Sequence, residues 1–242
     1  MTDQSIPAAT LILVRDRAGA APEILMVERA ERMAFAPGAL VFPGGRIDAA
    51  DKDFAASIGT DGAIIAVIRE TLEETAIPAA LTPTPDSGTA LELQRQLLAG
   101  ASLRDLGLTL DPAVLQPFAR WVPKFHAVRR FDTMFYVAAC PPGDWQPNVV
   151  EGECGRAEWA SAADILGREQ RGEARLIFPT RRTLERLAQH NSIAAIRADA
   201  ASHPIEPISP WVEDHGGKNF ITIPGHLGFP VTREPLDGLW RG

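Results

Sequence analysis

The sequence predicts an α/β protein in which helices cover both faces of a sheet. Apolar segments rich in β-branched or aromatic residues predict strands at 10–15, 23–29 and 129–139. Apolar positions spaced three and four residues apart predict helices at 64–77 and 180–190. The chain contains no internal repeat and no linker long enough to divide it. We therefore expect one elaborated α/β/α domain over residues 1–242.

The N-terminal half begins with a predicted hairpin, whose two strands are joined by a turn at 16–22 that includes Gly19. A third strand at 39–42 leads into a Gly-Gly turn. The helix at 64–77 ends before Pro78, which cannot continue a helix. After a loop, an amphipathic helix at 89–99 closes at Gly100, and Ser102 is expected to cap a short helix through Leu106. These helices define a helical insertion at about 88–110, for which a lid or a dimer element are both open.

The C-terminal half returns to the sheet with strands expected at 115–123 and 129–139. Helices are expected after these strands at 162–168, 180–190 and 192–200. Short strands are expected near the end of the chain, at 207–211 and 219–224.

Composition narrows the class of protein. Hydrophobic content of 45% and charged content of 23% are typical of a soluble globular protein. The net charge of −7, without a Lys/Arg-rich block, argues against a nucleic-acid groove as the main site. No run of ~18 apolar residues predicts a membrane span, and residues 1–9 do not form a signal peptide. Cys140 and Cys154 suggest neither a disulfide framework nor a zinc site, so a cytoplasmic setting is expected.

Three carboxylates on the helix at 64–77 form the strongest chemical pattern. Glu70, Glu73 and Glu74 have i, i+3 and i+4 spacing, so they lie on one face and repel by roughly 0.2–0.5 kcal/mol per pair. Arg69, four residues before Glu73, relieves part of this repulsion. A cation among the carboxylates would relieve the rest, and oxygen ligands suit Mg²⁺ or Mn²⁺. The alternative is an ordinary solvated helix face.

Upstream of this helix, the Gly44-Gly45 turn follows an apolar strand and would let a backbone carbonyl approach closely. Together the two segments resemble the Nudix box, whose pattern is Gly, five residues, Glu, seven residues, then Arg-Glu-apolar-x-Glu-Glu-x-Gly-apolar. The positions in register are Arg69, Glu70, Glu73, Glu74 and Ile77. The resemblance implies a Nudix-type α/β/α sandwich with a mixed central sheet and extra helical insertions.

The chain departs from the box in several ways. An insertion lies at about 48–62, Ala76 replaces the box glycine and Thr71 occupies an apolar position. The isolated box Glu has two possible counterparts, since Asp51 keeps the offset from Gly45 and Asp61 keeps the offset from Arg69.

An insertion at this point resembles a subgroup of Nudix hydrolases that includes peroxisomal enzymes cleaving coenzyme A. Trp121, Pro123 and the strand at 130–133 match the same subgroup. The C-terminal residues 239–242 lack a peroxisomal tripeptide, which again favours the cytoplasm.

The segment before the box resembles, imperfectly, a coenzyme A signature. Leu25, Arg29, Gly38 and residues 42–45 match it, but its second Arg falls on Ala34, with Arg32 nearby. Arg29, Arg32 and Arg46 are the candidate substrate-binding residues. The alternative for Arg29 and Arg32 is a pair of solvated surface cations.

The resemblance implies hydrolysis of a diphosphate in a small molecule, possibly within a homodimer. Its implied metal ligands are the Gly45 carbonyl, Glu70, Glu73 and Glu74, while Arg69 would orient a carboxylate. The catalytic candidates are Glu70, Glu73 and Glu153, with Glu151 as second choice to Glu153. A solvated acidic loop is the alternative for those last two. The short strands near the end of the chain are expected to cover the substrate side.

Three functions stay open. Coenzyme A or an acyl-CoA is one substrate class, and ADP-ribose or a dinucleotide is another. The third is a Nudix-like module that senses a nucleotide without cleaving it. The sequence contains no Gly-x-Ser-x-Gly elbow, Walker loop or Gly-x-Gly-x-x-Gly turn, and its five His residues lack metal-ligand spacing.

Overall fold

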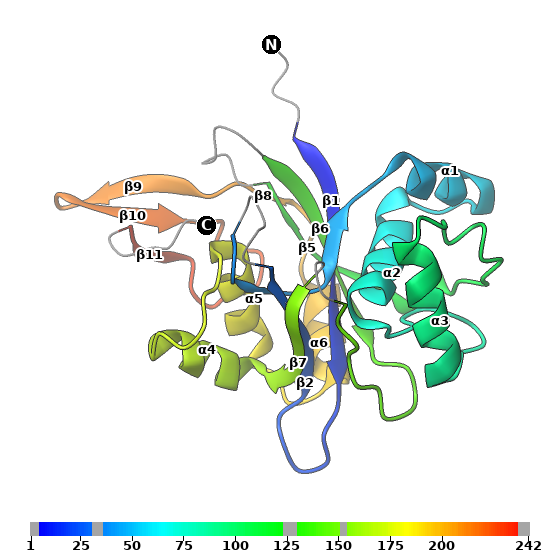
Figure 1. Ribbon diagram of the computed structural model, residues 1–242. Helices are drawn as coiled ribbons and strands as arrows, with labels where there is room; N and C mark the ends of the chain where they lie inside the picture. Colours follow the sequence, from blue (N-terminus) through cyan, green and yellow to red (C-terminus); the bar gives the residue numbers. More distant parts are fainter. Residues whose placement is uncertain (1–4, 31–35, 123–129, 151–153, 237–242) are drawn as a thin grey trace.

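A mixed central sheet separates two groups of helices (Figure 1). The computed structural model describes residues 5–30, 36–122, 130–150 and 154–236. The sheet has 8 strands in the order β3-β2-β1-β6-β5-β8, with β4 paired to β1 and β7 paired to β2. The first eight strands are β1 (Ile6–Arg15), β2 (Glu23–Arg29), β3 (Leu40–Val41), β4 (Gly44–Arg46), β5 (Gln116–Trp121), β6 (Phe131–Ala139), β7 (Cys154–Ser161) and β8 (Pro207–Ile208).

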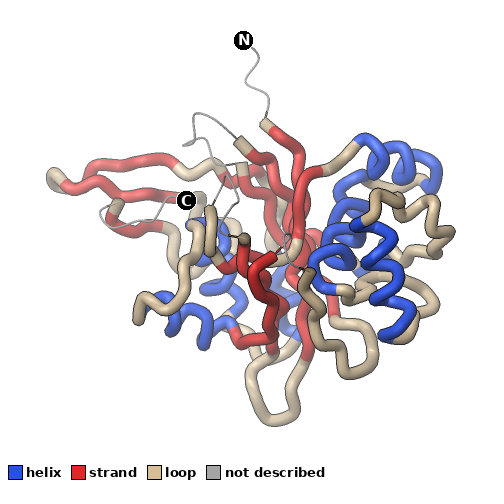
Figure 2. Tube along the Cα trace, in the orientation of Figure 1, coloured by secondary structure: helices blue, strands red, loops and turns tan. Residues whose placement is uncertain are grey.

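The sheet is mixed because β1 pairs in parallel with β6 and antiparallel with β2 and β4. Figures 1 and 2 show the helices in two layers, one on each side of the strands. The helices are α1 (Ala49–Ile58), α2 (Gly62–Thr75), α3 (Ser87–Leu98), α4 (Ala162–Gln170), α5 (Phe178–Leu187) and α6 (Ile193–Ser202), with a short 3₁₀ turn at Pro112–Val114. This arrangement confirms the predicted α/β fold with a mixed central sheet.

Strand β1 explains why the sheet has a core on each face. Successive side chains of a strand point to opposite faces, and every residue of 11–14 is fully buried. Leu11 and Leu13 pack in one core with α1, α2 and α3. Ile12 and Val14 pack in the other core with α4, α5 and α6. The continuous apolar run in the sequence is therefore the mark of a strand covered on both sides.

The structure adds one strand that was not predicted and corrects one predicted helix. Residues 154–161, which the sequence analysis did not assign to a strand, form β7, and they pair with β2 over its whole length. Residues 103–107 form turns and not a helix. Ser102 Oγ accepts a hydrogen bond from the backbone N–H of Asp105, at 3.2 Å, which gives a local turn with the look of a helix cap.

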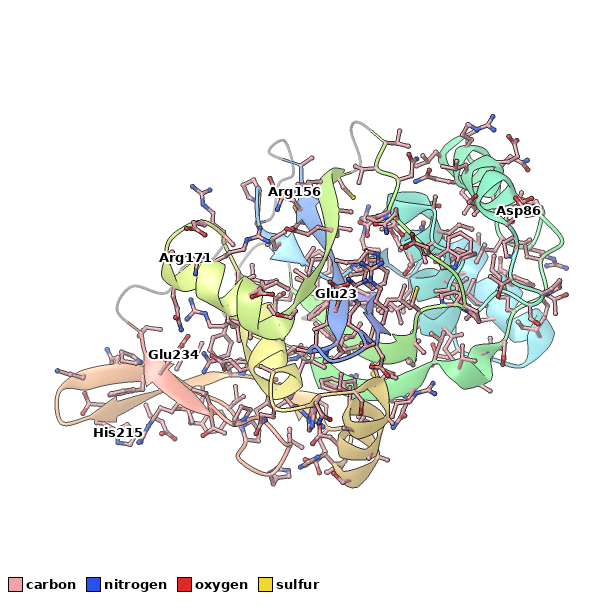
Figure 3. The ribbon with its side chains drawn as sticks, turned by 90° about the horizontal axis from the view of Figure 1, so that it is seen from below. Glu23, Asp86, Arg156, Arg171, His215 and Glu234 are labelled. Atoms are coloured by element: carbon pink, nitrogen blue, oxygen red, sulfur yellow. The ribbon has the colours of Figure 1, made fainter. Side chains whose placement is uncertain are left out.

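The last strands also differ from the prediction that they cover the substrate side. Strand β8 joins the central sheet beside β5, whereas β9 (Trp211–His215), β10 (Lys218–Thr222) and β11 (Arg233–Pro235) form a separate sheet. This sheet projects away from α2 in Figure 1, and Figure 3 shows its His215 and Glu234 at the opposite end of the molecule from Asp86, which precedes α3. The turn at Gly216 and Gly217, both with positive φ, folds β10 back onto β9.

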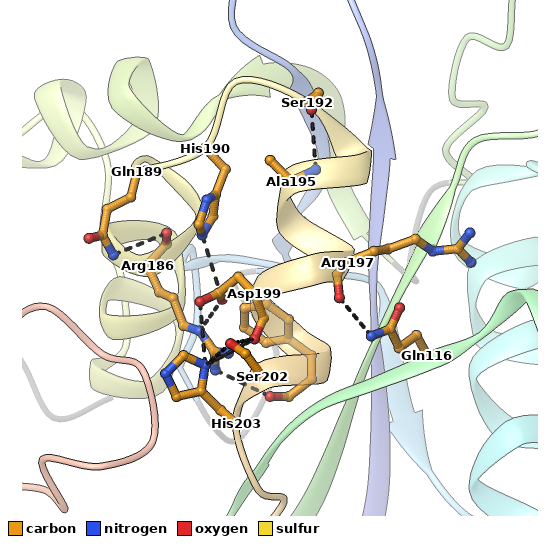
Figure 4. A network of polar contacts seen from close by, with 11 residues as sticks. Gln116, Arg186, Gln189, His190, Ser192, Ala195, Arg197, Asp199, Ser202 and His203 are labelled. Atoms are coloured by element: carbon orange, nitrogen blue, oxygen red, sulfur yellow. Dashed lines mark hydrogen bonds and ion pairs between the residues drawn. The ribbon is translucent and has the colours of Figure 1, made fainter.

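Helices α5 and α6 are joined through a buried cation (Figure 4). Arg186 is 1% exposed, donates to Asp199 Oδ2 at 2.7 Å and stacks on the Phe118 ring of β5. His190 and His203 also approach the Asp199 carboxylate. His190 and His203 therefore have a structural role, and they lie far from the box helix. None of the helices in the described ranges combines the length and apolar character that a bilayer-spanning segment requires.

A neighbouring carboxyl on α5 should make stability depend on pH. Burial raises the pKa of Glu185 from 4.5 to about 7, although the charge of Arg182, which donates to Glu185 at 2.7 Å, acts in the opposite direction. Between those two pH values the folded protein retains a proton that the unfolded chain has lost. The free energy of unfolding should therefore fall by at most about 3 kcal/mol through this group as pH rises from 4.5 to 7.

The Glu185→Gln variant should lose this part of the pH dependence, so that it gains stability relative to wild type at pH 8 but not at pH 4. Urea unfolding at a series of pH values measures the effect, with Glu92→Gln on α3 as the control. Parallel curves for wild type and Glu185→Gln would contradict the assignment.

Candidate active site

The Gly-Gly turn is tightly packed, and only glycine fits at position 44. A Cβ atom on Gly44 would lie 2.4 Å from the backbone O of Ala9, because β4 lies directly against β1. A Cβ atom on Gly45 would lie 2.2 Å from Glu70 Oε1. The glycines therefore serve two contacts, one with the sheet and one with the box helix. The carboxylate of Glu70 rests on the backbone of Gly45.

Glu74 reaches the same turn from one helical turn further along α2. Its Oε2 accepts a hydrogen bond from the Gly44 N–H at 3.0 Å. Burial raises the pKa of Glu74 well above its usual value, and the charge of Glu70 raises it further; the Gly44 N–H and the charge of Arg29 act in the opposite direction. Burial also raises the pKa of Glu70, whose side chain is only 17% exposed. The face of α2 that carries these carboxylates is therefore mostly enclosed and is not an open, solvated face.

Arg69 holds the other side of the cluster. Its Nη1 donates to Glu70 at 3.0 Å and to Glu73 at 3.1 Å, and its Nη2 donates to the backbone O of Arg46 at 3.0 Å. Its Nε and Nη2 donate to the two oxygens of Asp51, at 3.0 and 2.9 Å. Burial opposes the charge of Arg69, but the Asp51 hydrogen bonds and the surrounding carboxylates raise its pKa. One guanidinium thus connects α2 with α1 and β4.

The structure distinguishes the roles of Asp51 and Asp61, between which the sequence could not decide. Asp51 is 2% exposed and binds Arg69 through both oxygens, while one of these oxygens also accepts from the Asp48 N–H at the start of α1. Asp61 lies at the start of α2, where it accepts from the Ala63 N–H at 2.8 Å. Asp51 is therefore the partner of Arg69, and Asp61 is a helix cap.

This division of roles predicts different costs for the same substitution at the two positions. Asp51→Asn removes the negative charge from one of the three carboxylates that bind Arg69 and should lower the free energy of unfolding by about 2 kcal/mol. Asp61→Asn keeps a good N-cap residue and should change it by less than about 0.5 kcal/mol. Urea unfolding of both variants tests the assignment. Equal losses, or a larger loss for Asp61→Asn, would show that the two roles are reversed or shared.

Among the candidate substrate-binding cations, Arg29 lies close enough to Glu74 and Glu70 for their charges to act on its pKa. It ends β2, where burial lowers its pKa and the charges of Glu74, Cys154 and Glu70 raise it. Cys154 on β7 is its partner in the strand register, a neighbour that no sequence signal had indicated. Arg46 is exposed, and only its backbone carbonyl has a described contact with Arg69. Arg32, Glu151 and Glu153 lie outside the described residues.

The donor chemistry of the cluster fits a hard divalent cation. Glu70 and Glu74 supply carboxylate oxygens beside the Gly44-Gly45 backbone, and their mutual repulsion would be relieved by a cation between them. In the described ranges, however, no three His, Cys, Asp or Glu side chains are arranged as a ready ligand set. Glu73 accounts for part of the difference, because its carboxylate accepts from Arg69.

A cleft of about 210 Å³ lies between α1, α2 and the chain that follows α3, and Arg69 and Glu73 form part of its wall. The segments at 48–62 and 88–110, which the sequence analysis expects to be insertions, therefore both contribute residues that border α2 at this cleft. The sequence could not reveal this cleft, since its walls come from three segments that are apart in the chain. Its apolar part is formed by Phe54, Ile65, Leu97 and Leu103.

Comparison with known proteins supports the fold. The chain is similar to a crystal structure of a NUDIX hydrolase from Alicyclobacillus acidocaldarius, with a TM-score of 0.67 and 28% identity over 81% of this chain and 97% of that one. The MutT protein from Methanosarcina mazei Go1 is more distant, with a TM-score of 0.47 and 17% identity over 79% of this chain and 99% of that one. No family model matches the chain, and no curated protein matches its sequence.

The likeness to the Alicyclobacillus acidocaldarius enzyme extends over nearly the whole of that enzyme. It agrees with the mixed sheet and with the Gly44-Gly45 turn packed on the acidic face of α2. The chain is therefore similar to Nudix hydrolases in fold, and this likeness supports the activity of a Nudix pyrophosphohydrolase.

Proposed function

We propose that the chain hydrolyses the diphosphate bond of a nucleoside diphosphate linked to another moiety, with Mg²⁺ or Mn²⁺ as cofactor. The observation that carries the proposal is the contact of Glu70 and Glu74 with the backbone of Gly45 and Gly44. Enclosing two like charges in this way is unfavourable without a cation. A protein that only sensed a nucleotide would not need two enclosed carboxylates whose charges repel each other.

The residues that would hold the cation are Glu70, Glu74, Glu73 and the Gly45 carbonyl. When bound, the cation would neutralise the diphosphate and lower the pKa of a coordinated water. Arg69 orients Glu70 and Glu73 through its two Nη1 hydrogen bonds and is itself oriented by Asp51. Burial raises the pKa of Glu70, which makes its carboxylate a stronger base. Glu70 is therefore the first candidate for the base, with Glu73 and Glu153 as the others.

The substrate class rests on the cations beside the carboxylates. Arg29 is close enough to Glu74 and Glu70 for their charges to act on its pKa, so it can contact a phosphate oxygen of a diphosphate held there. Coenzyme A or an acyl-CoA is the first candidate, because Arg29 falls on the coenzyme A signature. ADP-ribose or a dinucleotide is the second, since Ala34 occupies the position of the second signature Arg.

Glu74→Gln should lower metal-dependent turnover by about 100-fold or more while the fold stays intact. Gln removes the buried charge and one anionic ligand but keeps the size of the side chain. The free energy of unfolding in chelator should stay unchanged or rise, because a carboxylate with a raised pKa is lost. Full activity in Glu74→Gln would rule out its role as a ligand. Glu92→Gln on the exposed side of α3 is the matched control.

A panel of coenzyme A, ADP-ribose, NADH and nucleotide sugars tests the activity itself. Phosphate-bond cleavage should require Mg²⁺ or Mn²⁺ and stop in chelator, and the substrate with the highest kcat/KM identifies the class. Turnover that persists in chelator would contradict the metal-dependent mechanism. Tight binding of one compound without cleavage in either metal would support the sensing module.

A further inference from the structure

One buried amide attaches the helical insertion to the end of the box helix. Gln94 of α3 is 1% exposed. Its Nε2 donates to the backbone O of Glu73 and to the backbone O of Asn148, both at 2.9 Å. Its Oε1 accepts from Asn148 Nδ2 at 2.7 Å. Both N–H groups of the amide and its oxygen are thus in use.

The Glu73 carbonyl is one that α2 cannot satisfy by itself. In a continuing helix it would accept from the N–H of Ile77, but the helix ends at Thr75 and Ala76 takes a left-handed conformation. The Ile77 N–H turns instead to Thr75 Oγ1, at 3.3 Å. Gln94 supplies the missing donor for Glu73.

The backbone carbonyl of Thr75 also receives its hydrogen bond from a donor outside α2. It accepts from the backbone N–H of Asn148 at 2.8 Å. Asn148 lies in the chain between β6 and β7, and its amide is already bonded to Gln94. Two segments from outside α2 therefore fix the last turn of that helix, which carries Glu73 and Glu74.

We propose that Gln94 is a positioning residue, which keeps the last turn of α2 in the orientation that Glu73 and Glu74 need to hold the divalent cation. This inference rests on the proposed metal-dependent function. It gives the helical insertion the role of a brace for the ligand-bearing turn. A longer or shorter side chain at position 94 could not donate to the Glu73 and Asn148 carbonyls together.

Gln94→Met removes the donors while keeping a side chain of similar length. Binding of Mn²⁺ without substrate, followed by the electron paramagnetic resonance signal of the free ion, should weaken by about tenfold or more. At saturating Mn²⁺, kcat should fall by about tenfold while KM changes by less than about twofold, because the diphosphate contacts remain. The matched control is Gln96→Met on the exposed face of α3, where Gln96 donates to Glu92.

Two further variants separate positioning from general stability. Asn148→Ala removes a side chain but keeps both carbonyls that Gln94 binds, so Mn²⁺ affinity should fall by less than about threefold. Gln94→Asn combined with Asn148→Gln keeps two facing amides, but the shorter Asn at position 94 cannot reach Glu73. The double variant should recover thermal stability and not Mn²⁺ affinity.

The outcomes distinguish this inference from the function on which it rests. If wild type binds Mn²⁺ and Gln94→Met binds it equally well, Gln94 has no positioning role and the proposed function stands. If wild type binds no Mn²⁺, the proposed function fails and this inference fails with it. If Gln94→Met melts below the assay temperature, Mn²⁺ affinity is compared between wild type and the double variant instead. Wild-type Mn²⁺ affinity in the double variant would overturn the proposal.

Discussion

The enclosed charge at Arg69 is the constraint on which the site depends. Its guanidinium binds Asp51, Glu70, Glu73 and the carbonyl of Arg46, so that α1, α2 and β4 share one cation. Each partner would be costly to leave alone in this setting, because a buried charge without a counter-charge loses its hydration without replacement. The carboxylates that Arg69 does not satisfy, above all that of Glu74, turn to the Gly44 backbone. The protein thereby concentrates negative charge beside the Gly44-Gly45 bend.

The rest of the structure holds this bend against the helix. Strand β4 is paired to β1, and β1 is buried on both faces at the centre of the sheet. The backbone of Gly44 and Gly45 pairs with β1, and the Gly44 N–H bonds to Glu74, so the turn is held against both β1 and α2. At the other end of α2, Gln94 and Asn148 supply the donors that the helix lacks. In the opposite helical layer, the buried cation Arg186 joins α5 and α6 through Asp199.

Much of the fold and of the site could be predicted because the signals are local. The strands at 10–15 and 23–29 are apolar enough to identify directly, and β1 and β2 pair as the predicted hairpin. The spacing of Glu70, Glu73 and Glu74 on one helix is likewise a local property. Strand β7 was missed because its polar residues face outward at the edge of the sheet, which breaks the apolar pattern. The short helix expected at Ser102 was a turn whose side-chain bond imitates a cap.

The sequence by itself determined which residues share a helix face, where that helix stops and which glycines precede it, since neighbouring positions and backbone geometry settle those features. Only the tertiary structure decided that Asp51 and not Asp61 binds Arg69, because both residues keep a plausible offset along the chain. It also decided that the last strands project away from α2, and that Gln94 completes the end of that helix. These outcomes depend on contacts between segments that are distant in the sequence. Their free energies come from burial and hydrogen bonding that no single segment possesses alone.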